Sequence, residues 1–81
     1  MDNGVEIRFF AAARAAAGVD QMYCPSAQFQ EIINELCRTE PALVPVIAQC
    51  TFLLDSVAVH DQNILVHDGS VIDVLPRFAG G

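Results

Sequence analysis

Apolar and polar residues alternate at the start of the chain, over residues 5–10. Val5, Ile7 and Phe9 fall on one side of the predicted element, and Phe10 falls on the opposite side together with the charged residues. Alternation with a period of two is typical of a strand that buries one face. The pattern therefore predicts an opening strand with an aromatic ring on its polar side.

Two weaker elements follow this strand. Residues 11–17 are rich in alanine and stop at Gly18, which is typical of a short helix closed by a C-terminal glycine. A helix of this length is not stable alone, so it must pack against the rest of the domain. Residues 19–24 then predict a second strand, which ends at Pro25.

One stretch predicts a well-defined amphipathic helix. Its apolar side chains recur three and four positions apart and so share one stripe; they are Phe29, Ile32, Ile33, Leu36 and Cys37. Ser26 stands at the expected N-cap, and Arg38 lies in the last turn, where a positive charge suits the helix dipole. Pro41 prevents the helix from continuing.

The second half of the chain predicts three further strands. Residues 44–47 predict one helical turn, and residues 51–55 and 57–60 predict a hairpin with a tight turn between its strands. Residues 71–75 are nearly all apolar, as in a strand that is covered on both faces.

The order of these elements restricts the fold. A buried last strand must lie in the middle of the sheet beside the first strand, and one helix can cover only one face. We therefore predict an α+β β-grasp (ubiquitin-like) fold, a mixed sheet of about five strands with one main helix packed on one face. Residues 1–75 would form this domain, and residues 76–81 an extended C-terminal tail.

Composition and charge narrow the choice of partners. The 81 residues make one small domain, and 53% of them are hydrophobic, which is more than such a domain can bury. An exposed apolar patch and a protein partner follow from this excess. The net charge is −6, and the four basic residues are scattered arginines, which argues against nucleic acid and membrane partners. No apolar run has the length of a membrane span, so we expect a soluble, cytoplasmic protein.

The cysteines and histidines suggest no metal site and no catalysis by this chain alone. Cys24, Cys37 and Cys50 are odd in number and lack the C-x-x-C spacing of zinc sites, so we expect buried free thiols. His60 and His67 are each followed by an aspartate, but neighbours in an extended segment point to opposite faces. These pairs are therefore predicted to be solvated turn residues.

The chain ends in Gly80-Gly81. Because glycine has no Cβ, two glycines can lie extended in a channel too narrow for other residues and bring the terminal carboxylate to another protein's catalytic groups. The alternative is an ordinary frayed terminus, where glycine is also common.

Three segments together resemble one family. They are the opening residues 7–14 followed by Gly18, the Asp68-Gly69 turn before the last strand, and residues 76–81, which are similar to the family's "PPxxGG" end. The chain thus resembles the MoaD/ThiS group of ubiquitin-like sulfur carriers, and within it the small, sulfur-carrier subunit of molybdopterin synthase. Arg77 departs from the pattern, because the family usually has a second proline at this position.

The resemblance implies a carrier that is not catalytic alone. Gly81 would be adenylated by an E1-like adenylyltransferase, converted to a thiocarboxylate with sulfur from a donor protein, and inserted into the synthase large subunit. There the sulfur would attack cyclic pyranopterin monophosphate during molybdenum cofactor biosynthesis. ATP would be bound by the activating partner, because this chain has no phosphate-binding G-x-x-x-x-G-K-[ST] loop and binds no cofactor itself.

Two alternatives remain open at this point. The sulfur acceptor could instead belong to thiamine, cysteine or tRNA thiolation, or the chain could be a β-grasp interaction module that is never thiolated. In the carrier reading, the tail residues that would insert into the partner are Pro76, Arg77, Phe78, Ala79 and Gly80. Two aromatic residues, Phe10 and Phe52, are candidates for the partner interface, against the ordinary role of phenylalanine in a core.

Overall fold

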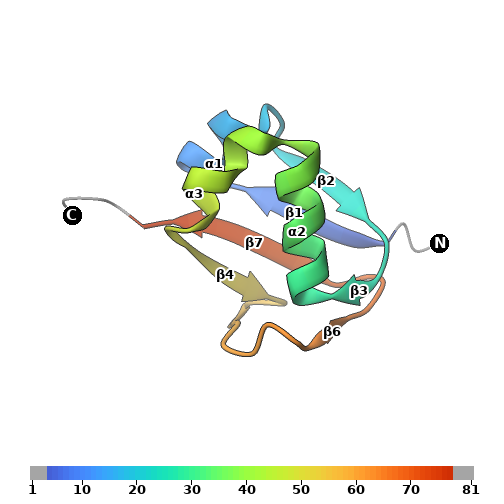
Figure 1. The fold of residues 1–81 in the computed structure, drawn as a ribbon. Coiled ribbons are helices and arrows are strands. Elements are labelled where there is room, and N and C mark those ends of the chain that lie inside the picture. The colour runs from blue at the N-terminus through green and yellow to red at the C-terminus, as the bar shows by residue number, and fades with distance from the viewer. Residues whose placement is uncertain (1–3, 78–81) are drawn as a thin grey trace.

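The computed structural model describes residues 4–77 of the chain (Figure 1). The helices and the 3-10 turn are α1 (Ala11–Ala17), α2 (Phe29–Thr39), η1 (Pro41–Leu43) and α3 (Val44–Ile47). The strands are β1 (Val5–Phe9), β2 (Gln21–Cys24), β3 (Ala27–Gln28), β4 (Cys50–Leu54), β5 (Val57–Ala58), β6 (Leu65–Val66) and β7 (Val71–Pro76). None of the helices within the described residues is long and apolar enough to cross a membrane.

Five strands form one mixed sheet in the order β2-β1-β7-β4-β5, and β3 and β6 form a separate pair. The last strand, β7, lies in the middle, parallel to β1 and antiparallel to β4. The helix α2 crosses one face of this sheet (Figure 1). The predicted β-grasp arrangement, with the last strand beside the first, is therefore confirmed.

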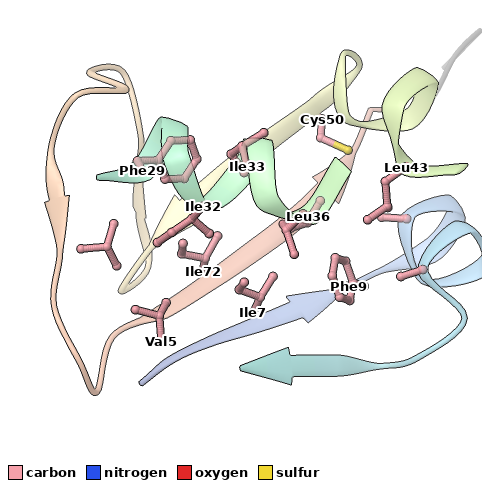
Figure 2. Close-up of a cluster of buried hydrophobic side chains, with 14 residues drawn as sticks. Val5, Ile7, Phe9, Phe29, Ile32, Ile33, Leu36, Leu43, Cys50 and Ile72 are labelled. Atoms are coloured by element: carbon pink, nitrogen blue, oxygen red, sulfur yellow. The ribbon is translucent and has the colours of Figure 1, made fainter. Parts of the chain in front are cut away.

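The core lies between α2 and the sheet (Figure 2). β1 contributes Val5, Ile7 and Phe9, all buried as the alternation predicted. The predicted stripe of α2 faces them, with Phe29, Ile32, Ile33 and Leu36 buried and Cys37 partly buried at its edge. On β7, Ile72 and Val74 are fully buried on the same side.

The opposite side of β7 differs from the sequence prediction of apolar cover on both faces. Between Ile72 and Val74 the chain carries Asp73, which alternation directs away from α2 and which is nevertheless only 8% exposed. Its cover is the side chain of Arg8 on the neighbouring strand. Val71 and Leu75, which share this face, are half-buried.

The predicted N-cap of α2 was wrong. Ala27 and Gln28 pair with Val66 and Leu65 before the helix begins, so the chain is still extended at Ser26. The Ser26 hydroxyl instead donates to the carbonyl oxygen of Val66, at 2.6 Å. Gln28 is the N-cap residue, and its backbone N–H donates to the Glu31 carboxylate at 3.3 Å, in the manner of a capping box.

The hairpin differs from the prediction in the length of its second strand, and one pair of short strands was not predicted. The second strand of the hairpin includes only Val57–Ala58, although Val59 still donates to the Phe52 carbonyl. The turn between β4 and β5 is the tight turn expected at Asp55-Ser56, where both residues have positive φ, as in a type I′ hairpin. The short pair of β3 and β6 was missed, because two-residue strands leave no periodic pattern.

Two glycines with positive φ allow a direct test of packing against the edge strand. At Gly4 (φ +90°) a Cβ atom would lie 2.3 Å from the Cys24 carbonyl oxygen on β2, whereas at Gly18 (φ +79°) it would meet nothing within 4 Å. We expect Gly18→Ala to lower the free energy of unfolding by about 1 kcal/mol, the conformational cost alone. Gly4→Ala should cost at least about 1 kcal/mol more, because backbone must also move. Urea denaturation of the two variants measures the difference, and equal losses would contradict the predicted clash.

Candidate functional site

The root of the C-terminal tail is fixed to the sheet. Pro76 is the last residue of β7 and pairs with Cys50 on β4. The backbone N–H of Arg77 then donates to the Gln49 carbonyl oxygen at 3.0 Å. The strand thus ends one residue later than predicted, and the first two residues of the predicted tail are held beside β4. Phe78, Ala79, Gly80 and Gly81 lie outside the described residues.

Hollows lie on both sides of this root. One, of about 430 Å³, is called here the tail-root notch, and its lining consists of Ala11, Ala12, Pro45, Val46, Gln49, Pro76 and Arg77. The other, of about 450 Å³, lies between α2 and the β4–β5 region, and its lining includes Phe29, Phe52, His60 and Arg77. Arg77 borders both hollows.

The sheet face opposite α2 carries an ion pair at its centre. Arg8 and Asp73 are register partners on β1 and β7. The guanidinium binds the carboxylate through two nitrogens, with Nε to Oδ1 at 2.7 Å and Nη2 to Oδ2 at 3.1 Å. These hydrogen bonds, and then the attraction to the carboxylate, raise the pKa of Arg8 above its ordinary value. The Asp73 side chain is 12% exposed and that of Arg8 47%, so the arginine shields the carboxylate from water.

Apolar side chains surround this ion pair. Leu53 on β4 is the other register partner of Asp73 and is half-buried, as are Val71 and Leu75 on β7. Phe10 follows β1 and is 40% exposed, so the prediction that this ring lies outside the core is confirmed. The open face thus offers apolar area around a paired, charge-neutral centre, which is a composition that protein interfaces tolerate well.

Phe52 lies on the other face of the sheet. Its ring packs edge-on against that of Phe29, with centroids 5.2 Å apart and an interplanar angle of 76°. The residue is half-buried against the core and also borders the second hollow. An interface role for Phe52 stays a prediction, and if it exists it belongs to a different surface from that of Phe10.

The thiols and imidazoles do not form a catalytic group within residues 4–77. Burial raises the pKa of the Cys24, Cys37 and Cys50 thiols, which keeps them protonated and poorly nucleophilic at neutral pH. The Cys50 thiol also donates to the Val46 carbonyl oxygen at 3.2 Å. No group of three or more potential metal ligands occurs in the described part of the chain.

The sequence profile of the ThiS family matches residues 7–81 of the chain. The chain belongs to the ThiS family. This ThiS-family chain is also 26% identical to a molybdopterin synthase sulfur carrier subunit from Chlamydomonas reinhardtii, over 81 residues that cover 95% of this chain and 98% of the relative. The predicted resemblance to sulfur carriers is therefore confirmed at the level of the family.

Solved structures share its fold. The small archaeal modifier protein 1 from Methanosarcina acetivorans is 22% identical and superimposes with a TM-score of 0.84, covering 95% of each chain. A chain in the complex of subunits 1 and 2 of molybdopterin-converting factor from Helicobacter pylori is 23% identical, with a TM-score of 0.70 and coverage of 95% of this chain and 97% of that chain. At such identities the similarity establishes the β-grasp fold.

Sequence reasoning missed the pair of Arg8 and Asp73, although a signal was present. Arg8 falls on the polar side of the first strand, and Asp73 is the one acidic residue inside the nearly apolar last strand. Once the first and last strands are predicted to be neighbours, an aspartate in the buried strand and an arginine on the polar side of the first strand are expected to form an ion pair. The register that places them side by side comes from the structure.

Removing the arginine of this pair should destabilise the domain more than removing an exposed one. Arg8→Gln leaves the poorly solvated Asp73 carboxylate without its partner, and a stranded buried charge is costly. Arg14→Gln is the control, because Arg14 lies 3.8 Å from Asp20 with both side chains largely exposed. In thermal unfolding, Arg8→Gln should lower the melting temperature more than Arg14→Gln does. Adding Asp73→Asn to Arg8→Gln should restore part of this loss. Equal melting temperatures for the two arginine variants would argue against a structural role for the ion pair.

The tail root allows a second test. Arg77→Pro and Arg77→Ala both remove the guanidinium, but only proline removes the N–H that donates to Gln49. We expect the free energy of unfolding of the proline variant to be about 0.5–1 kcal/mol lower than that of the alanine variant. The restricted φ of proline stabilises the folded state slightly and offsets only part of the lost hydrogen bond. Urea titration of the pair measures this difference, and a proline variant as stable as the alanine variant would show that the bond contributes nothing.

Proposed function

We propose that this ThiS-family chain is the sulfur carrier subunit of a molybdopterin synthase, with Gly81 as the residue that carries the sulfur. The observation that supports this most is the tail root: β7 is the central strand, and it delivers a tethered Arg77 four residues before the C-terminus. Four further residues can span at most about 14 Å. A short reach from a rigid base suits delivery of a terminal group into another protein's channel.

The chemistry starts with activation of the terminal carboxylate. A carboxylate resists nucleophiles until one of its oxygens becomes part of a leaving group, so an E1-like partner would use ATP to form the acyl adenylate at Gly81. A persulfide on a donor protein would then displace AMP and form an acyl disulfide with Gly81, and a reducing thiol would cleave the S–S bond to leave the thiocarboxylate. Since activation consumes ATP, we place this exchange in the cytoplasm. The side chains in residues 4–77 support a passive role, because the thiols are protonated and form no catalytic group.

The proposed acceptor is cyclic pyranopterin monophosphate, bound by a molybdopterin synthase large subunit. In support, the relative from Chlamydomonas reinhardtii, matched over nearly the whole of both chains, is named a molybdopterin synthase sulfur carrier subunit. The open face around Arg8 and Asp73, with Phe10 at its edge, is the surface that we propose for docking of the large subunit. Its half-buried Leu53 and Leu75 would be covered on binding.

The same domain shape also fits other functions. The superposition with the small archaeal modifier protein 1 of Methanosarcina acetivorans has a TM-score of 0.84, so the same domain shape serves a protein named as a modifier. A carrier of sulfur for thiamine, cysteine or tRNA thiolation, and a module that is never thiolated, remain the alternatives. Thiolation of the terminus separates the carriers from the last of these.

The test is reconstitution with an E1-like enzyme, a persulfide donor, a thiol reductant, a large subunit and the pyranopterin precursor. We expect an ATP-dependent oxygen-to-sulfur mass change at the terminus, followed by conversion of the precursor. Deletion of Gly81, or addition of one residue after it, should abolish loading or transfer while thermal unfolding stays unchanged. One residue added before Met1 is the matched control and should leave activity intact. Full activity of either C-terminal variant would falsify the carrier role, and loading without conversion would point to a different acceptor.

A further inference from the structure

The tail-root notch is an open apolar hollow built from three separate parts of the fold. The start of α1 contributes Ala11 and Ala12, α3 contributes Pro45 and Val46, and the end of β7 contributes Pro76. The polar residues of its lining are Gln49 and Arg77. These residues are far apart in the sequence, so only the packing of α1 and α3 beside the end of β7 creates the notch.

The notch exists because its walls carry small or rigid side chains. The two alanines present only methyl groups at the start of α1, and the proline rings of Pro45 and Pro76 cannot swing across the opening. Gln49 is fixed through its backbone, because its carbonyl accepts the N–H of Arg77. The hollow has a volume of about 430 Å³, and most of its walls are small or rigid side chains.

The backbone at the notch is strained. Ala11 has φ of +51°, a left-handed conformation that is unfavourable for a residue with a Cβ atom. Within residues 4–77, the other residues with positive φ that are not glycine, Asp55 and Ser56, form the β4–β5 hairpin turn, where such values are normal. At Ala11 the strain instead sets the direction in which α1 leaves β1, and with it the position of one wall.

The length of the tail requires a partner to approach the notch. Arg77 is both the last described residue of the chain and part of the lining, and four residues remain beyond it. Because these can span at most about 14 Å, a protein that takes Gly81 into a channel must bring its own surface close to the tail root. An apolar group placed in the notch would be favoured, because it would meet the methyl groups of Ala11 and Ala12 and the rings of Pro45 and Pro76.

We propose that the tail-root notch receives a large aliphatic or aromatic side chain of the protein that binds the tail, and that this contact fixes how far the tail enters. The inference rests on the proposed carrier function. With the notch filled, the domain cannot slide along the channel, so the end of the tail stops at one depth. A displacement by one residue would move the terminal group by about 3.3 Å, which is enough to separate it from the reacting atoms.

The experiment fills the notch from this side. Ala12→Trp places an indole ring in the hollow, and Ala12→Glu places a charge at the same position without filling it. Val57→Trp is the control, because Val57 is an exposed apolar residue on β5 and does not line the notch. Residue 12 is exposed, so the fold should survive, which urea denaturation verifies. Affinity for a molybdopterin synthase large subunit is measured by titration calorimetry, and precursor conversion is measured with chemically thiolated carrier.

The expected result is a loss of affinity of about tenfold or more in both Ala12 variants, as for an occluded interface pocket, with Val57→Trp within about twofold of the parent. Retained affinity with conversion reduced about tenfold in Ala12→Trp also supports the inference, because it shows a misplaced tail end. Parental affinity and conversion in both Ala12 variants would overturn it, as would an equal loss in Val57→Trp. A parent chain that does not bind the large subunit at all contradicts the proposed function instead.

Discussion

The pairing of β7 between β1 and β4 is the constraint on which the rest of the molecule depends. A strand at the end of the chain that lies in the middle of the sheet must join the first strand in parallel and the fourth antiparallel. This pairing completes the core, because Ile72 and Val74 meet the apolar stripe of α2 only from the central position. It also places the tail root, Pro76 and Arg77, at the end of the central strand beside β4.

The ion pair on the open face follows from the same pairing. β7 needs one face against α2, and its other face is covered by neighbouring strands' side chains rather than by a second helix. Asp73 would be costly there without a partner, and Arg8, in register on β1, supplies both hydrogen bonds and shielding. The result is a face with apolar borders and a neutral centre. Such a face can meet a partner without leaving a charge unpaired on either side.

The chain also has few nucleophilic side chains that could react with an activated C-terminus. It contains no lysine, and its three thiols are kept protonated by burial. A carrier of an acyl adenylate or a thiocarboxylate has no use for nucleophiles of its own close to that group. In the function proposed above, the selectivity of transfer would then be left to the partner proteins.

The sequence by itself determined the elements whose patterns are local. The alternation of residues 5–10 predicted β1, the apolar stripe predicted α2, the alanine run before Gly18 predicted α1, and a nearly continuous apolar run predicted the central strand. The order of these elements was enough to predict the β-grasp. These features could be predicted because each depends on residues that are close together in the chain.

Only the tertiary structure decided the features that join distant segments. The pairing of β3 with β6 keeps the chain extended at Ser26 and moves the cap of α2 to Gln28. The register of β1 against β7 brings Arg8 to Asp73, and the packing of α2 over β4 turns Phe52 toward Phe29. The bond from Arg77 to Gln49 and the notch beside it arise in the same way. These features share one physical reason. Each depends on a distance between residues that are far apart in the sequence. The packing of the core sets this distance, and a local sequence pattern does not encode it.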